Sequence, residues 1–380
     1  MYTPVFYALN DTVDEAPFLE TDKIFSDTGR NTGNLAFTYA TRRLLGENVT
    51  GFNWSGSHQK NDNELLVVSC ANQLGAHCDM GEQAKKIEKM DMPVIALGLG
   101  AQAGSVSEMP EVPQGTIDWY DAMASKALSD KPNIALRGEH TYQYLKSIGR
   151  EKSAVVLGCP SNLISPFRDL GKRIKDREVF PPKRVAVAAG SPWVPKHRML
   201  ERTLADMVTQ TGGSYITQMT LEMIQLARAD FSHMDKEVLL KYKNFLRPNM
   251  VLPEFMQWCR QHVEMFTHVP SWMEHLRKFD FVVGNRIHGV MLALQAGVPA
   301  MCIAHDSRIV ELCETMCVPY VHMDEVSKHG LNIYNLQSYY NFDAEKYDFQ
   351  RLELAEKFRQ FFQNNSLTEL KRLSVFLEGE

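Results

Sequence analysis

The first half of the chain alternates short apolar runs with segments of helical spacing. Apolar runs typical of buried strands occupy 4–9, 64–72, 93–101 and the first parts of 133–149 and 153–163. Apolar residues recur three or four positions apart in 32–45, 81–91, 117–128 and the later part of 133–149. Strands and helices that alternate in this way predict a parallel sheet covered by helices.

The second half starts the same pattern again. It predicts strands at 183–190, 214–219, 263–269, 279–284, 298–304 and 320–326, and helices at 197–212, 221–242, 252–262, 270–280 and between 286 and 297. The segment between the halves, 168–184, is charged and contains a Pro-Pro pair, so it is interpreted as a linker. The last segment, 344–378, predicts two helices that pack on another part of the protein.

These patterns predict an α/β protein of two Rossmann-like domains that face a cleft. The N-terminal domain would span 1–170 and the C-terminal domain 183–330, with a helical tail, 331–380, that crosses back to the first domain. A chain of 380 residues is longer than a single core usually supports. Ligands of open α/β sheets bind beyond the carboxyl ends of the strands. Three turns at that edge are therefore the expected site: 26–34, 137–140 and 284–289.

Composition and charge narrow the classes of function. The net charge of −5 argues against a nucleic-acid-binding protein, which usually carries a basic surplus. The seven cysteines form no CxxC pair and have no histidine cluster beside them, so we expect reduced thiols and no metal site. The N-terminus lacks the features of a signal peptide and no apolar run could span a bilayer. The expected location is the cytoplasm.

The segment 279–304 carries the strongest chemical signal. Its strand ends at Gly284, and a helix begins close to Arg286 and His288. The free N–H groups of a helix N-terminus bind anions, and a guanidinium group binds a carboxylate or phosphate through two parallel hydrogen bonds. Histidine is the side chain best suited to proton transfer near neutral pH. The turn therefore predicts an anion site with an acid or base beside it, although an ion pair with a neighbouring acid would also explain the arginine.

Two other strand ends offer related signals. Arg137 lies at the end of an apolar run and is a second candidate anion clamp. A salt bridge to Glu139 is the structural alternative. The loop 26–37 contains Gly33 and Asn34, which allow tight turns and close approach of the backbone to a ligand. Ser161 follows a strand and would line the cleft, whereas Cys159 has no base near it in the sequence.

Several segments together resemble one family. "FDFVVGNRIHGVMLALQAGVPAMCIAHDSR" is similar to the signature segment of polysaccharide pyruvyl transferases, in which R-[LI]-H-G precedes a helix and an A-G-V-P stretch. "GRNTGNLAF", "IALRGEHTYQYLKSIG" and "VVLGCPSNL" resemble other segments of that family. The first of these has Leu35 where the family usually has an acidic residue.

The resemblance implies a fold like that of GT-B glycosyltransferases and an enzyme that transfers the pyruvyl group of phosphoenolpyruvate to sugar hydroxyls. The products would be a cyclic ketal and phosphate, with no cofactor. His288 would be the catalytic acid or base. By match of motif, Arg286 and Arg137 would bind the donor. The other candidate substrate-binding residues follow from their places at the strand ends: Asn285, Gly289, Gly33, Asn34, Ser161, His305 and Glu311. The last two would lie on the acceptor side, with a solvated loop as the alternative. A lipid-linked glycan acceptor would bring the protein to the inner face of the membrane, and the oligomeric state stays open.

Two alternatives remain at this point. The first is a nucleotide-sugar glycosyltransferase of the same architecture. Retaining enzymes of that kind often have two glutamates eight positions apart before an A-G-V-P-like stretch, and this chain has Gly284 and Leu292 there. The second alternative is a non-catalytic protein of the same fold that binds carbohydrates or anions.

Overall fold

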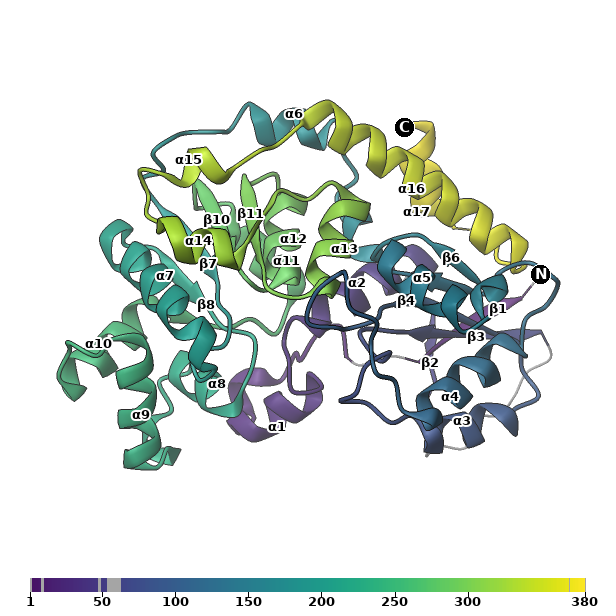
Figure 1. Ribbon diagram of the computed structural model, residues 1–380, viewed down its shortest axis with the longest axis horizontal. Coiled ribbons are helices and arrows are strands. Elements are labelled where there is room, and N and C mark those ends of the chain that lie inside the picture. Colours follow the sequence, from purple (N-terminus) through teal and green to yellow (C-terminus); the bar gives the residue numbers. More distant parts are fainter. Residues whose placement is uncertain (1, 8–9, 47–48, 53–62, 369, 380) are drawn as a thin grey trace.

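The computed structural model describes residues 2–7, 10–46, 49–52, 63–368 and 370–379. These residues form two parallel six-stranded sheets, each flanked by helices (Figure 1). The predicted α/β class with two parallel sheets is therefore confirmed. The exact division at 170 and 183 stays a prediction.

The first sheet has the strand order β2-β1-β3-β4-β5-β6. Its strands are β1 Thr3–Tyr7, β2 Thr50–Gly51, β3 Glu64–Ser69, β4 Val94–Leu99, β5 Ile134–Leu136 and β6 Ala154–Val156. The helices that follow them along the chain are α2 Asn34–Leu45, α3 Gly81–Glu88, α4 Gln114–Ala124 and α5 Glu139–Ser147. The central strands are buried on both faces, which explains why they read as continuous apolar runs. Residues 8 and 9 of the strand predicted at 4–9 lie outside the described residues.

The second sheet has the order β12-β11-β10-β7-β8-β9. Its strands are β7 Val185–Ala188, β8 Ser214–Ile216, β9 Val263–Glu264, β10 Phe281–Gly284, β11 Ala300–Ala304 and β12 Tyr320–His322. Its helices are α7 Arg198–Thr211, α8 Leu221–Ala227, α9 Lys236–Leu246, α10 Leu252–His262, α11 Val269–Leu276, α12 Ile287–Gln295, α13 Ser307–Met316, α14 Met323–His329 and α15 Leu336–Tyr339. In both sheets the strand that leads to a candidate arginine, β5 or β10, is followed directly by a helix.

The C-terminal tail connects the two domains. Helices α16 Ala344–Asn364 and α17 Lys371–Glu378 run from the second sheet to the first along the top of Figure 1. Phe358, Phe362 and Leu373 pack in one core with Leu65 and Ile95 of the first sheet. The tail therefore covers, together with the end of α2, one face of the first sheet.

The segment predicted as a linker contains a helix, α6 Leu170–Lys175. Leu170 and Ile174 are buried, and the Asp348 carboxylate of α16 accepts hydrogen bonds from the backbone N–H groups of Gly171, at 2.6 Å, and Lys172, at 3.2 Å. The linker interpretation missed this helix because half of its residues are charged and only two of its side chains, those of Leu170 and Ile174, are large and apolar.

A short N-terminal helix lies on the second domain. In Figure 1, α1 Thr21–Asp27 lies beside α8. The Thr21 hydroxyl donates a hydrogen bond to Asp230 at 2.7 Å, and Arg228 donates one to the carbonyl of Leu19 at 2.8 Å. The loop that follows α1 therefore returns to the first domain across the cleft, which places Asn31 and Asn34 between the sheets.

None of the helices in the described part of the chain combines the length and apolar character that a bilayer span requires.

Candidate active site

A pocket between the two domains lies at the carboxyl ends of the strands, and we call it the cleft pocket. Its volume is about 40 Å³. The first domain contributes Asn31, Asn34, Phe37, Ala71, Asn72 and Arg137, and the second contributes Gln218, Asn285, Arg286, Ile287, His288 and Arg308. Its position agrees with the general rule for ligand sites in open α/β sheets.

The turn that carries Arg286 is fixed by close backbone packing. A Cβ atom at Gly284 would lie 2.1 Å from the Ala188 carbonyl oxygen of β7, so only glycine allows β10 to end there. Arg286 precedes the first residue of α12, and its guanidinium group donates a hydrogen bond to the Ser191 hydroxyl at 2.6 Å. Ser191 follows β7, so two adjacent strand ends set the direction of the Arg286 side chain.

The buried carboxyl group of Glu201 holds this turn in place through hydrogen bonds. It accepts hydrogen bonds from the Asn285 side chain at 3.0 Å, from the Gly190 N–H at 3.1 Å and from the Tyr215 hydroxyl. Burial raises the pKa of Glu201. A Cβ atom at Gly190 would lie 1.9 Å from the Asn285 side-chain oxygen, so a side chain there would displace the whole arrangement.

Arg286 lies close to a second cation, Arg308, and to the carboxyl groups of Glu201 and Asp306. Burial, followed by repulsion from Arg308, lowers the pKa of Arg286 to about 10. The Nε atoms of Arg286 and Arg308 and the side-chain nitrogen of Gln218 are buried without a hydrogen-bond partner. Buried donors in folded proteins are nearly always paired. These three donors are therefore available to an anionic ligand.

Arg137 brings a third guanidinium group from the first domain. Only 2% of its surface is exposed, and its Nε donates a hydrogen bond to the Gly98 carbonyl at 2.8 Å. Its guanidinium carbon lies 5.7 Å from the centre of the Phe37 ring. Burial lowers the pKa of Arg137. Backbone carbonyls and an aromatic face thus hold this cation at the pocket.

His288 lies in the first turn of α12, between Phe37 and Cys159. Its ring centre is 5.3 Å from that of Phe37, and its Nε2 is 3.7 Å from the Cys159 sulfur. The Ser161 hydroxyl donates a hydrogen bond to the same sulfur at 3.1 Å. Burial, followed by the charges of Arg137 and Arg308, holds the pKa of His288 well below 6.5, so the imidazole is neutral at pH 7.

The structure brings together five of the predicted residues in the cleft pocket: Asn34, Arg137, Asn285, Arg286 and His288. Gly33 and Gly289 lie directly behind its wall, because a Cβ atom at either would come within 2.8 Å of the Gln218 side chain. Ser161 and His305 do not line the pocket. Ser161 supports Cys159, and His305 packs on the His197 ring with 4.7 Å between centres. Their contact with a substrate stays a prediction.

Four polar residues that line the pocket were not predicted individually from the sequence: Asn31, Asn72, Gln218 and Arg308. The last three follow the carboxyl ends of β3, β8 and β11 within four residues, so the strand-end rule applied to every strand would have found them. Arg308 is paired with Asp306 at 3.1 Å and completes a set of three arginines. Among the described residues that line the pocket, none is a carboxylate.

Glu311 lies outside the pocket, in a contact between the domains. It is 2% exposed and accepts hydrogen bonds from the Thr141 N–H at 2.9 Å and the Thr141 hydroxyl at 2.8 Å. Gly138 permits this approach, since a Cβ atom there would lie 2.7 Å from the Glu311 Cβ. Glu311 therefore joins α5 to α13. Its contact with an acceptor stays a prediction.

Glu311 predicts a pH-dependent stability. Burial raises its pKa from 4.5 to about 7. Because the folded-state value is the higher one, the folded protein binds the extra proton, and the contribution of Glu311 is most favourable below pH 4.5. We expect the free energy of unfolding to fall, by on the order of 3 kcal/mol, as pH rises from about 4.5 to about 7, and then to level off.

Urea unfolding between pH 4.5 and 8 measures this contribution as the difference between wild type and Glu311→Gln, in which the titration is absent. The matched control is Glu314→Gln, at an exposed position of the same helix. A pH profile of Glu311→Gln parallel to that of wild type would contradict the assignment.

No group of three or more His, Cys, Asp or Glu side chains within the described ranges could hold a metal ion.

Comparison with known proteins gives a family but no near relative. No curated protein sequence matches the chain. A functionally uncharacterised protein, KP1_0663 from Klebsiella pneumoniae, is 12% identical, with 84% of this chain and 93% of that chain covered and a TM-score of 0.42. Os79 from O. sativa, solved with UDP and deoxynivalenol-3-glucoside, is 10% identical, with 97% and 88% covered and a TM-score of 0.37. Neither score is high enough to support an argument.

The family model described as polysaccharide pyruvyl transferase matches residues 31–307, which is most of the chain. The matched range begins in the loop before α2 and includes β5, β10, Arg137, Arg286 and His288. The chain therefore belongs to the polysaccharide pyruvyl transferase family.

Proposed function

We propose that the protein transfers the pyruvyl group of phosphoenolpyruvate to two hydroxyl groups of a glycan, forming a ketal and releasing phosphate. One observation carries the proposal: Arg137, Arg286 and Arg308 converge on a single pocket that also contains the neutral imidazole of His288. Family membership supports pyruvyl transfer, and the charge and chemistry of this pocket support the choice of donor.

The donor matches the pocket in charge. Phosphoenolpyruvate carries a carboxylate and a phosphate on a three-carbon skeleton, and each group accepts paired hydrogen bonds from guanidinium. The unpartnered Nε atoms of Arg286 and Arg308 are suitable donors. The first N–H groups of α12 add partial positive charge on the same side. A bound anion would also relieve the repulsion among the three arginines.

The reaction requires two carbon–oxygen bonds to form at the central carbon of the donor. In the first step one sugar hydroxyl adds to this carbon, and a proton is delivered to the methylene carbon, which becomes a methyl group. In the second step another hydroxyl of the same sugar replaces the phosphate, whose bond to the central carbon breaks. The proton of that hydroxyl leaves with the phosphate or with a base.

His288 is the group that can move these protons. A neutral imidazole can accept the proton of the attacking hydroxyl, whereas an imidazolium could not. The negative charge of the bound donor then favours the protonated ring, which can return the proton to the substrate. The arginines hold the donor and stabilise the charge that develops on the departing phosphate.

The domains must separate for the donor to enter. The cleft pocket, at about 40 Å³, is far smaller than the roughly 300–1,000 Å³ of most small-molecule sites. Contacts between the domains near it include a hydrogen bond from the Thr32 N–H to the Gln218 carbonyl at 2.9 Å and the packing of Phe37 on His288. We infer an opening that breaks this bond and moves Asn31 and Asn34 away from Arg286.

Thermal shift separates this proposal from the glycosyltransferase alternative. We expect phosphoenolpyruvate to raise the melting temperature, while UDP and UDP-glucose leave it unchanged. Phosphate release from phosphoenolpyruvate, measured with a panel of glycosides, then tests turnover and identifies the acceptor. Stabilisation by the nucleotides alone would overturn the proposal, and stabilisation by phosphoenolpyruvate without turnover on any glycoside would favour a binding protein.

A further inference from the structure

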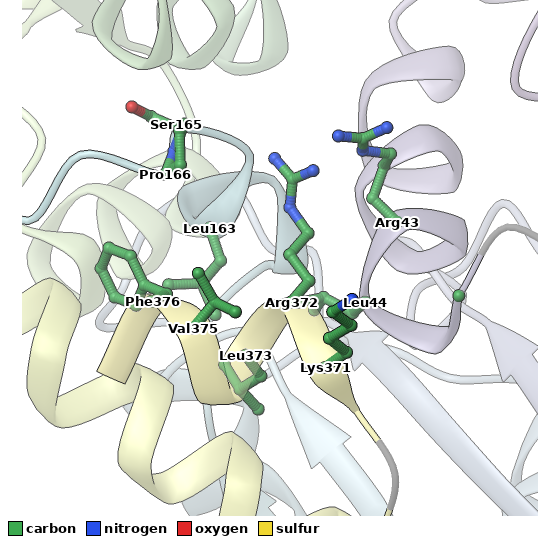
Figure 2. Close-up of a pocket in the computed structure, with 11 residues that line it drawn as sticks. Arg43, Leu44, Leu163, Ser165, Pro166, Lys371, Arg372, Leu373, Val375 and Phe376 are labelled. Carbon is green, nitrogen blue, oxygen red and sulfur yellow. The ribbon is translucent and has the colours of Figure 1, made fainter. Parts of the chain in front are cut away.

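A second, larger pocket lies away from the cleft, and we call it the α17 pocket. Its volume is about 500 Å³. It is enclosed by the end of α2, the segment 163–166 and α17, through Arg43, Leu44, Gly46, Leu163, Ser165, Pro166, Lys371, Arg372, Leu373, Val375 and Phe376 (Figure 2). None of these residues lines the cleft pocket.

The two pockets lie at opposite ends of α2. Asn34 and Phe37 near the start of this helix line the cleft pocket, and Arg43 and Leu44 near its end line the α17 pocket. At 1.5 Å per residue, the separation along the helix is about 12 Å. The α17 pocket is therefore distinct from the site proposed for the donor.

The floor of the α17 pocket is apolar. Leu44, Leu163, Leu373 and Phe376 are buried residues of the core that α16 and α17 share with the first sheet, and Val375 is half-buried beside them. Aliphatic and aromatic side chains of this kind form the walls of most small-molecule sites, whose volumes run from about 300 to 1,000 Å³.

The rim of the α17 pocket is cationic. It contains Arg43, Lys371 and Arg372, and among the described residues that line it there is no Asp or Glu. Figure 2 shows the guanidinium groups of Arg43 and Arg372 directed to the same side of the opening. Three cations around one apolar pocket are notable in a chain whose net charge is −5. Arg43 and Arg372 also interact with other groups of the protein. An occupant that combines an anionic group with an apolar chain would match both this rim and the apolar floor.

The wall between α2 and α17 is held rigidly. The buried Arg351 of α16 donates hydrogen bonds to three backbone carbonyls of this wall: Asn162 at 3.1 Å, Ser165 at 2.9 Å and Phe167 at 2.7 Å. Arg372 also donates to the Ile164 carbonyl. A site built in this way is already formed before a ligand binds, which lowers the entropic cost of binding.

The cationic surface continues beyond the α17 pocket. A neighbouring pocket of about 450 Å³ shares Ser165, Pro166 and Arg372 with it. Arg173, Arg177 and Arg277 line this neighbour together with Glu274, and Arg173 is paired with Asp169 at 2.7 Å. A phosphate monoester carries about −1.5 to −2 charges at pH 7, against −1 for a carboxylate, so a rim with several cations favours phosphate as the anionic group.

We propose that the α17 pocket binds one molecule of a lipid that bears a phosphate group. Its apolar chain lies against Leu44, Leu163 and Phe376, and its phosphate contacts Arg43 and Lys371 at the rim. The binding involves no covalent step. It does not depend on the donor that the cleft pocket uses, so it can fail or succeed independently of the proposed function.

Isothermal titration with monododecyl phosphate, below its critical micelle concentration, tests this proposal. We expect saturable one-to-one binding by wild type, and at least ~10-fold weaker binding by the double variant R43A/K371A, because two charge-assisted contacts are lost. Val375→Trp, which fills the pocket, should weaken binding to a similar extent. Inorganic phosphate and dodecanol should each bind much more weakly than the amphiphile.

Matched variants keep the test specific. Lys357→Ala and Val179→Trp alter an exposed lysine and an exposed valine that do not line the pocket, and both should bind as wild type does. Melting temperatures show whether each variant is folded. If Val375→Trp does not fold, R43A/K371A provides the test, because its changes lie at the rim of the pocket.

Four results would overturn the proposal. One is equal binding by wild type and both pocket variants, and another is equal affinity for dodecanoate. The third is binding to phosphatidylcholine vesicles that contain phosphatidate without binding to monododecyl phosphate, since this would indicate a charged surface rather than a pocket. A dimer that wild type forms and R43A/K371A does not form would likewise indicate that this face binds a second copy of the chain.

Discussion

Replacing Arg286 by methionine should reduce kcat/KM for phosphoenolpyruvate by ~10²–10³-fold, the range seen when one preorganised charge-stabilising donor is removed. Methionine fills similar space but offers no donor to the carboxylate or phosphate. Arg286→Lys should recover only part of the loss, because an ammonium group keeps the charge but cannot form two parallel hydrogen bonds. Phosphate release at varied phosphoenolpyruvate, with an acceptor found in the panel, measures the effect.

The same substitution should leave stability unchanged or raise it. Burial and Arg308 already lower the pKa of Arg286, so its charged form is held at some energetic cost, and function rather than folding explains its presence. Arg359→Met on α16 is the control, because the hydrogen bond and ion pair of Arg359 join it to Glu356 on the same helix. A large fall in the melting temperature of Arg286→Met with unchanged binding of phosphoenolpyruvate would identify Arg286 as a structural residue.

The sequence predicted the second-domain half of the site well because that half is local. The strand, the glycine at its end, the arginine and histidine, and the helix capped at Gly297 are all contained in residues 279–297, and Gly297 has the positive φ of 75° expected after a helix. The strand-end rule needs only the order of strands and helices, which the hydrophobic pattern supplies. The same reasoning placed Arg137 at the cleft.

Contacts between distant segments could not be predicted in this way. Cys159 has no base near it in the sequence, yet the structure places its sulfur 3.7 Å from His288 Nε2, across the interface between the domains. Glu201 supports Asn285 from a helix 84 residues earlier, and Glu311 reaches Thr141 over 170 residues. The pattern of a single sequence predicts which side chains follow the end of a strand. The packing of one domain on the other decides which of these side chains contact each other.

Replacing His288 by alanine should lower kcat by ~10²–10⁴-fold, the usual contribution of a positioned acid or base. The affinity for phosphoenolpyruvate should change little, because the arginines provide most of the binding. Removing the imidazole also leaves the Cys159 thiol without its neighbour, so Cys159→Ala is needed as a separate variant. If His288 carries the proton, Cys159→Ala should retain most of the activity.

The discriminating comparison is therefore between turnover and binding. Titration of phosphoenolpyruvate gives the Kd of wild type and His288→Ala, and phosphate release gives kcat for both, with His329→Ala at an exposed position as the control. A large loss of kcat at constant Kd assigns proton transfer to His288. Unchanged kcat in His288→Ala would contradict that role, and a loss in Cys159→Ala as large as in His288→Ala would instead indicate that the thiol and the imidazole act as one unit, because residues that act together show non-additive effects.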